Sequence, residues 1–325
     1  MEAVLPRRDV TCKRPRRVAG HRVDPGCGAR DSVGGVTSEL ALLTDVPALD
    51  AIGRVRDASR AADGTDPVDE AVTLRLKHHG LAGTGAWVVP EAFALRHEGS
   101  LDLAVAPSSR GQGLGAALGA LAVAEPGPLT AWSHGDHPAA AALARRWGFA
   151  RTRELWVMRR AAALPLPPAE PPAGVRIRDF GASDAEAVLA VNTAAFAHHP
   201  EQGALDAAGL AERMAEPWFD PAGLLLAVDD DGELLGFHWT KQHDGAVGEV
   251  YVLGVSPAAQ GRGLGKVLTV AGLQHLAARG VAEVLLYVES DNAPARGLYE
   301  RLGFQHAAAD THVQYQRLDL SEVST

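Results

Sequence analysis

The chain has 325 residues, of which 46% are apolar and 22% charged, so it can bury real cores and is not an intrinsically disordered polymer. Its net charge of −9 is uneven, because residues 1–30 hold eight basic and three acidic side chains. The rest of the chain is therefore more acidic than the whole, which argues against nucleic acid or an anionic membrane as a binding partner. Both cysteines, Cys12 and Cys27, fall in the basic segment. This excludes a disulfide scaffold, a cysteine nucleophile and a thiolate metal site from the rest of the chain.

A proline-rich stretch divides the chain. Residues 164–172 read LPLPPAEPP, and proline can neither donate to a strand ladder nor follow a helical residue easily. We therefore predict a basic, disordered leader over 1–37, an N-terminal domain over 38–160, a linker over 161–174 and a C-terminal domain over 175–320. The leader lacks the apolar core of a secretory signal, which predicts a cytoplasmic protein.

The two predicted domains are copies of one plan. LDLAVAPSSRGQGLG (101–115) matches YVLGVSPAAQGRGLG (251–265), and AWSHGDHPAAAALARRWGF (131–149) matches LYVESDNAPARGLYERLGF (286–304), in the same order and with similar spacing. We infer a duplication in which each copy runs strand, glycine-rich turn, helix, strand, helix.

The second copy shows this plan most clearly. Its apolar patterns, caps and turn residues predict, in chain order, a hairpin of strands over 224–228 and 234–240, a strand over 249–255, a helix over 265–278, a buried strand over 284–288, and a helix over 293–302 capped by Asp291-Asn292.

The segment 260–265, QGRGLG, lies between a predicted strand and a predicted helix, and 110–115, RGQGLG, repeats it. Glycines allow positive φ and close approach of a ligand, and a helix start attracts anions, so the pattern favours a pyrophosphate site. A tight turn without a ligand is the alternative. The segment is neither a Walker loop nor a GxGxxG dinucleotide fingerprint.

These motifs resemble those of the GNAT N-acetyltransferases. HHPEQG (198–203), GEVYVLGVSPAAQGRGLG (248–265) and LYVESDNAPARGLYERLGF (286–304) resemble more narrowly the tandem-GNAT mycothiol synthases. The resemblance implies an α/β (α+β) fold of two GNAT acyl-CoA N-acyltransferase domains, each a mixed, mostly antiparallel sheet flanked by helices. It also implies acetyl-CoA as co-substrate, no metal, a monomer, and acetylation of the cysteinyl amine of 1D-myo-inositol 2-(L-cysteinylamino)-2-deoxy-glucopyranoside to give mycothiol.

The resemblance also assigns cofactor-binding positions. In the second copy these are Leu253, Gly254, Val255, Gln260, Gly261, Arg262, Gly263, Leu264, Gly265, Lys266, Asn292, Ala293, Pro294, Ala295, Arg296 and Gly297. In the first copy they are Leu103, Ala104, Val105, Gly111, Gln112, Gly113, Leu114, Gly115 and Ala116.

Transfer of an acetyl group from a thioester to an amine needs a base, a stabilised oxyanion and a proton for the leaving thiolate. Glu249, at the start of the strand that leads to the turn, is the candidate base, and Tyr299 stands where the family places the acid. Backbone N–H groups near Leu253 to Val255 would hold the oxyanion. Since neither domain contains cysteine, we expect direct transfer. A solvent-facing Glu249 and a purely structural Tyr299 are the alternatives.

The first copy lacks these groups. Gly99 aligns with Glu249, and Ala144 aligns with Tyr299. Glu98 is one residue away from the first position, which in a strand means the opposite face. We therefore predict one active site, in the C-terminal domain, and a catalytically degenerate N-terminal domain.

The resemblance assigns substrate contacts to Glu70, Glu201, Lys241, Tyr287 and Glu249 itself. Carboxylates and lysine or tyrosine donors suit a substrate with many hydroxyls and an ammonium group. Solvated surface charge is the alternative for Glu70, Glu201 and Lys241. His78-His79 and His198-His199 lack further ligands at metal spacing.

Two other functions remain open. One keeps the acetyltransferase chemistry but uses another small amine or a protein N-terminus as acceptor, since fold and base do not specify the acceptor. The other is a non-catalytic acetyl-CoA-binding module, against which the retained Glu249 and Tyr299 speak.

Overall fold

The computed structural model describes residues 40–197, 203, 205–243 and 245–318, and the chain from Ala41 onward forms one compact unit. In this described part, eleven strands form a single sheet. Their spatial order is β1 (Gly85–Val89), β2 (Ala92–His97), β3 (Ser100–Val105), β4 (Leu129–Ser133), β11 (Gln305–Arg317), β5 (Ala150–Ala161), β10 (Glu283–Glu289), β9 (Val247–Val255), β8 (Leu234–Gln242), β7 (Leu224–Asp229) and β6 (Val175–Asp179).

Only the β3–β4 and β9–β10 neighbours run parallel among these strands. The predicted α/β class with a mixed, mostly antiparallel sheet is therefore confirmed.

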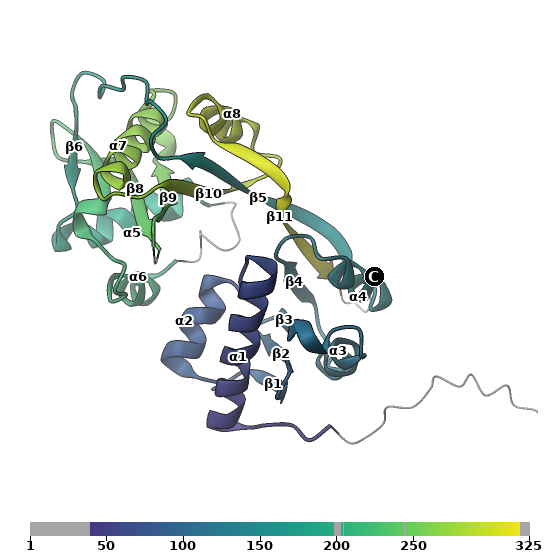
Figure 1. Cartoon of the computed structure of the whole chain (residues 1–325). Helices are drawn as coiled ribbons and strands as arrows, with labels where there is room; N and C mark the ends of the chain where they lie inside the picture. The colour runs from purple at the N-terminus through teal and green to yellow at the C-terminus, as the bar shows by residue number, and fades with distance from the viewer. Residues whose placement is uncertain (1–39, 198–202, 204, 244, 319–325) are drawn as a thin grey trace, which may run out of the picture. The chain divides into compact units, whose positions relative to one another are not determined.

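Helices cover both faces of this sheet. The described residues form α1 (Asp45–Asp63), α2 (Glu70–His79), α3 (Leu114–Ala124), α4 (Pro138–Arg146), α5 (Ala185–Ala195), α6 (Ala207–Met214), α7 (Leu264–Ala278) and α8 (Ala293–Arg301). Helices α1 and α2 lie on one face of β1–β3 and α3 on the other (Figure 1). Helix α5 packs on β8 and β9 in one apolar core, while α7 packs on β9 and β10 in another. No helix in the described ranges combines the length and apolarity that crossing a membrane requires.

Two segments of the chain repeat the same series of elements. β3, a glycine turn, α3, β4, α4 and β5 recur as β9, a glycine turn, α7, β10, α8 and β11. We call the part up to β5 the first repeat and the part from β6 the second repeat. The helix caps agree as well: His137 accepts a hydrogen bond from Ala139 N at the start of α4, and Asn292 accepts one from Ala295 N at the start of α8. This agreement is what a duplication predicts.

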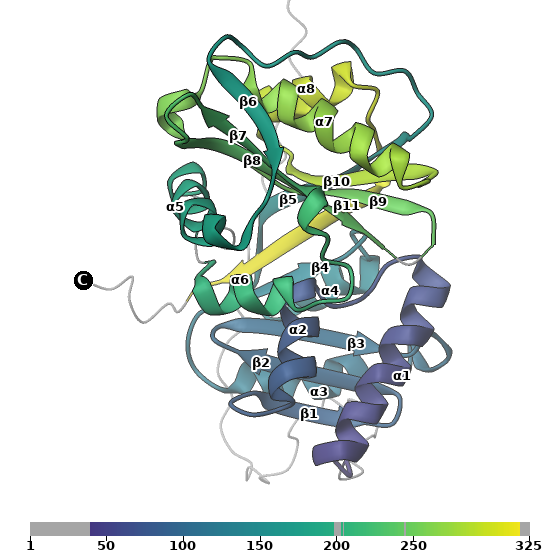
Figure 2. The same ribbon diagram turned by 90° about the vertical axis from the view of Figure 1, so that its left-hand side faces the viewer.

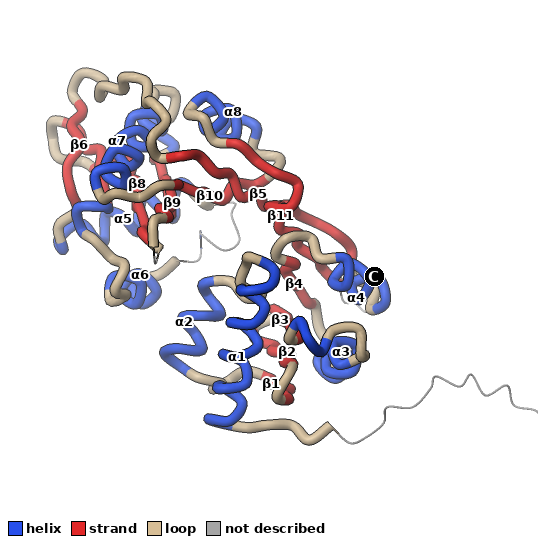
Figure 3. The backbone as a smooth tube through the Cα atoms, viewed as in Figure 1, coloured by secondary structure: helices blue, strands red, loops and turns tan. Residues whose placement is uncertain are grey.

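The last strand of each repeat pairs with strands of the other repeat. β5 lies between β10 and β11, and β11 lies between β4 and β5 (Figures 1 and 3). Figure 2 shows the same two strands between β10 and β4. The sequence did not predict this exchange, because the apolar pattern of a strand does not name its neighbour. The predicted domain boundaries stay a prediction.

The first repeat departs from the second before its parallel strand. β3 begins only at Ser100, and His97 pairs with Ser100, so Glu98 and Gly99 form a two-residue hairpin turn. Both have positive φ, 46° and 80°, as a type I′ turn requires. The expectation that Glu98 faces the opposite side of a strand from Gly99 is therefore wrong, because neither residue is in a strand.

A buried histidine sets how closely α7 approaches the sheet. His238 of β8 is fully buried, its Nδ1 lies 2.8 Å from Leu268 O, and burial lowers its pKa to about 4. A Cβ added at Gly272 would lie 2.1 Å from the His238 ring. Helix α7 therefore needs glycine where it crosses this side chain.

We expect Gly272→Ala to lower the free energy of unfolding by about 1–3 kcal/mol, because the added methyl overpacks the core. Gly53→Ala in α1 is the matched control, since a Cβ there meets nothing within 4 Å. The control should raise stability by about 0.4–1 kcal/mol through reduced freedom of the unfolded chain. Urea denaturation measures both, and equal stability of the two variants would contradict this account of the α7 packing.

Candidate active site

The glycine turn of the second repeat joins β9 to α7. Gly261 and Gly263 have φ of 77° and 80°, and Gly263 caps α7 without any side-chain hydrogen bond. Such a helix start leaves backbone N–H groups for a ligand, and its dipole favours an anion. The predicted cofactor positions from Gln260 to Lys266 lie on this turn and the first residues of α7, and those from Asn292 to Gly297 lie at the start of α8.

β9 and β10 separate next to this turn. They pair in parallel only from Val247–Val250 against Glu283–Leu286, while β9 stays paired with β8 as far as Val255. From Tyr251 to Val255, the edge of β9 toward β10 has no ladder partner among the described strands. A bulge lies at the same point: Trp239 pairs with Val252 and Thr240 with Val250, so Tyr251 of β9 is the extra residue. Successive residues of a strand direct their backbone groups to opposite edges, so part of the predicted oxyanion segment from Leu253 to Val255 offers backbone groups on this open edge.

Glu249 lies on β9 just before the strands separate. Its side chain is buried, and His243 Nε2 lies 2.7 Å from its Oε2. The histidine donates this hydrogen bond, since an ionised carboxylate can only accept. The carboxylate is thus held inside the structure beside the edge of β9 instead of facing solvent.

Tyr299 lies on α8 in the apolar core of the second repeat. Its ring packs edge-on against Phe304, with centroids 5.8 Å apart. Burial raises the pKa of its hydroxyl to about 12, so the group is protonated at neutral pH. Among the described residues, this hydroxyl has no hydrogen-bond partner.

A polar cluster brings together predicted substrate contacts from both repeats. Glu70 of α2 forms an ion pair with Lys241 of β8 and accepts a hydrogen bond of 2.5 Å from the Tyr251 hydroxyl. Arg213 of α6 donates to the same hydroxyl at 2.9 Å, and the Lys241 ammonium lies 4.6 Å from the centre of the Trp218 ring. Burial, followed by the charge of Glu70, raises the pKa of Tyr251. We call these five residues the acceptor cluster.

Another predicted contact lies on β10, the strand beside β9. Tyr287 of β10 is 45% exposed, and its ring meets His312 with centroids 5.6 Å apart. Glu201 lies outside the described residues, as do Cys12 and Cys27.

Sequence reasoning missed His243, Tyr251, Arg213 and Trp218. His243 lies two residues after Lys241 and Tyr251 two after Glu249, so the side-chain alternation of a strand could have found both. No local pattern singles out Arg213 or Trp218.

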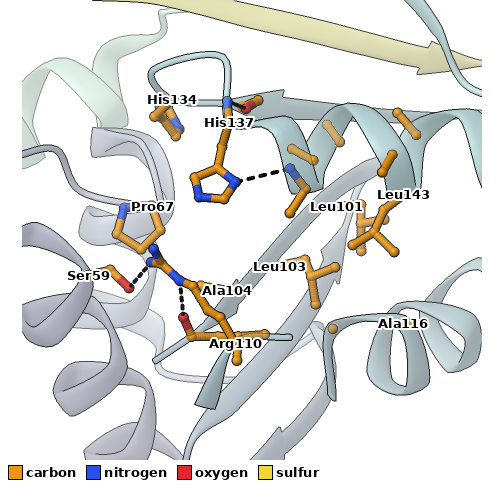
Figure 4. A pocket seen from close by; sticks show the side chains of 18 of the residues that line it. Ser59, Pro67, Leu101, Leu103, Ala104, Arg110, Ala116, His134, His137 and Leu143 are labelled. Carbon is orange, nitrogen blue, oxygen red and sulfur yellow. Dashed lines mark hydrogen bonds between the residues drawn. The ribbon is translucent and has the colours of Figure 1, made fainter. Parts of the chain in front are cut away.

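The first repeat contains a pocket of 430 Å³ around its own glycine turn (Figure 4). Eight of the nine cofactor positions predicted in the first repeat line this pocket, and Gln112 does not. Arg110 holds the turn, donating to Val105 O at 3.1 Å and pairing with Asp63. Gln260, its counterpart in the second repeat, cannot form such an ion pair.

Groups of three or more His, Cys, Asp or Glu that could hold a metal ion do not occur in the ranges the structure describes.

Residues 191–304 match the acetyltransferase (GNAT) family model. A mycothiol acetyltransferase of Nocardioides sp. is 61% identical over 288 residues, which cover 83% of this chain and 97% of that protein. The chain belongs to the mycothiol acetyltransferase family.

Solved structures agree on the fold. A GCN5-related N-acetyltransferase from Sphaerobacter thermophilus is 26% identical with a TM-score of 0.63, covering 84% of this chain and 94% of its own. A tandem GNAT protein from the clavulanic acid biosynthesis pathway is 19% identical with a TM-score of 0.59, covering 83% and 95%. The second of these bears on the fold alone.

If the second turn binds the pyrophosphate of coenzyme A, Gly263→Ala should weaken that binding by about tenfold or more, because φ of 80° strains any residue with a Cβ. Gly280→Ala, at the other end of α7, is the matched control with the same φ and equally open surroundings. Calorimetric titration of both variants with coenzyme A compares them. Equal affinities would contradict the assignment of the anion to this turn.

Proposed function

We propose that this chain transfers the acetyl group of acetyl-CoA to the cysteinyl amine of 1D-myo-inositol 2-(L-cysteinylamino)-2-deoxy-glucopyranoside, giving mycothiol. Kinship with a mycothiol acetyltransferase over 97% of that protein's length supports the acceptor. The chemistry rests on one observation in particular. A buried carboxylate, Glu249, lies on β9 where β9 leaves β10 and leads into a glycine turn suited to pyrophosphate.

Acetyl-CoA would bind along this path. Its pyrophosphate would lie on the N–H groups at the start of α7, and its pantetheine arm would follow the edge of β9 from Tyr251 to Val255. The thioester oxygen would then accept hydrogen bonds from backbone N–H groups near Leu253 to Val255, which stabilise the charge that develops on it.

Glu249 would act as the general base, through a water molecule if the amine does not reach it. An α-amine has a pKa of about 7.7–8.0, so about 10–20% of it is neutral at pH 7 and its deprotonation costs only about 1 kcal/mol. His243 holds one oxygen of Glu249 and so limits its rotation. The neutral amine attacks the thioester carbonyl and the C–S bond breaks. The proton that the nitrogen loses as the amide forms passes to solvent, and Tyr299 regains from solvent the proton that it gives to the thiolate.

Tyr299 would act as the general acid. As the C–S bond breaks, the thiolate of coenzyme A takes the hydroxyl proton of Tyr299, which burial keeps on that oxygen at neutral pH. The thiolate has a pKa of about 8.5, so it needs this proton mainly below that pH.

The acceptor would lie beside Glu249 and the acceptor cluster. Lys241 and Glu249 are directly paired across β8 and β9, so their side chains share one face of the sheet. Through Glu70, the first repeat would also contribute to acceptor binding. Tyr287 and Glu201 would add further contacts to the acceptor. Cytoplasmic location, a monomeric state and the absence of nucleic-acid or membrane partners stay predictions.

The decisive experiment is turnover by the purified chain. It should consume acetyl-CoA with the cysteinyl-glucosaminyl-inositol amine at a kcat/KM well above that with aminoglycosides, other small amines or peptide N-termini. Faster turnover of another acceptor would replace the acceptor in the proposal. Failure to turn over any amine would favour a non-catalytic module.

We expect Glu249→Gln to lower kcat/KM by about a hundred- to ten-thousandfold, the contribution of a general base. Glu98→Gln is the matched control, because Glu98 is 84% exposed by side chain and lies next to Gly99, which aligns with Glu249. Steady-state kinetics of both variants test the assignment. Retained activity in Glu249→Gln would show that another group accepts the proton.

Tyr299→Phe keeps the packed ring but removes the proton donor. At pH 7 we expect kcat to fall by about a hundredfold, with an unchanged KM for acetyl-CoA. The loss should shrink as the pH rises above about 8.5, since the thiolate then leaves without protonation. A loss that is constant with pH would contradict the acid role.

A further inference from the structure

Two histidines meet where the repeats exchange strands. His312 lies on β11, and His134 directly follows β4 of the first repeat. Because Val313 pairs with Ser133 in the antiparallel β11–β4 ladder, His312 and His134 stand opposite each other. Their Nδ1 atoms are 3.0 Å apart, and their rings are nearly perpendicular with centroids 4.7 Å apart.

The contact requires two neutral rings of opposite tautomer. One Nδ1 must carry a proton and donate, while the other must be bare and accept. Burial lowers the pKa of His134 to about 4 and that of His312 to about 3, so both are neutral at pH 7. A directional hydrogen bond between two desolvated rings fixes the orientation of each.

Each of the two histidines also contacts a different part of the molecule. His134 lines the pocket of the first repeat (Figure 4). His312 is buried, and its ring packs at 63° against Tyr287. Tyr287 is half exposed on β10. Among the aromatic contacts of the described residues, His312 is the ring that Tyr287 meets.

We propose that His134 and His312 are a positioning pair: through His134, the first repeat holds the His312 ring against Tyr287 and so orients Tyr287 for the acceptor. The inference rests on the proposed function only in taking Tyr287 as an acceptor contact. It gives the catalytically silent repeat a task at the active site that does not require a ligand in its own pocket.

His134→Phe and His134→Gln separate the hydrogen bond from the bulk of the side chain. Phe keeps a ring but cannot bond to His312, whereas Gln retains a donor and an acceptor. We expect His134→Phe to raise the acceptor KM by about three- to tenfold, the range that the loss of one neutral hydrogen bond allows. The KM for acetyl-CoA and kcat should stay unchanged, and His134→Gln should restore most of the acceptor affinity.

A second readout needs no substrate. The chain has four tyrosines, so protein labelled with 3-fluorotyrosine gives few ¹⁹F resonances, and Tyr287→Phe identifies that of Tyr287. This resonance should shift or broaden in His134→Phe, and return toward the wild-type position in His134→Gln.

The kinetic and ¹⁹F measurements test the proposed function and the positioning pair separately. Absent turnover by the wild type would refute the proposed function, and the ¹⁹F spectrum alone would then decide the pairing. An unmoved Tyr287 resonance would overturn the inference. So would an unchanged acceptor KM in an active enzyme, or equal losses in kcat and acetyl-CoA affinity in both variants, which would indicate general damage to the fold.

Discussion

The antiparallel pair of β5 and β11 holds the two repeats in one sheet, and the remaining features depend on it. β5 completes the sheet of the second repeat beside β10, and β11 completes that of the first beside β4. Buried backbone donors and acceptors must be bonded, so pulling the repeats apart would leave unpaired edges on both. The exchange also places His134 opposite His312. A tandem duplication has thereby become one structural unit from Ala41 onward.

The two repeats share backbone features but differ in the side chains at the proposed catalytic positions. Both keep a glycine turn with two positive φ angles and a polar cap on the last helix, because the local backbone requires them. The positions proposed to be catalytic differ. The counterpart of Glu249 falls in a tight hairpin turn, and the counterpart of Tyr299 is Ala144, whose small side chain lines the 430 Å³ pocket. Where the second repeat has the Tyr299 hydroxyl, the first repeat has part of a pocket.

The carboxylates of Glu70 and Glu249 have different partners. Glu70 is neutralised by Lys241 and bonded by Tyr251, which suits a residue that shapes a binding surface. Glu249 lies directly across from Lys241, yet the lysine reaches to Glu70 instead. In the described structure, Glu249 pairs only with His243. The two carboxylates are therefore held by different side chains, Glu70 by Lys241 and Tyr251, and Glu249 by His243.

The sequence by itself determined what depends on neighbours in the chain. The glycine turns follow from positions that only glycine occupies without strain, the strands from β-branched runs, and the caps of α4 and α8 from side chains that bond two or three residues ahead. The motif resemblance located Glu249 and Tyr299 on their elements. Only the tertiary structure decided the strand exchange, the pairing of Glu70 with Lys241 and the contact of His134 with His312. Residues more than 120 positions apart meet in these contacts. The energy that selects them comes from closing the whole sheet, to which no local pattern refers.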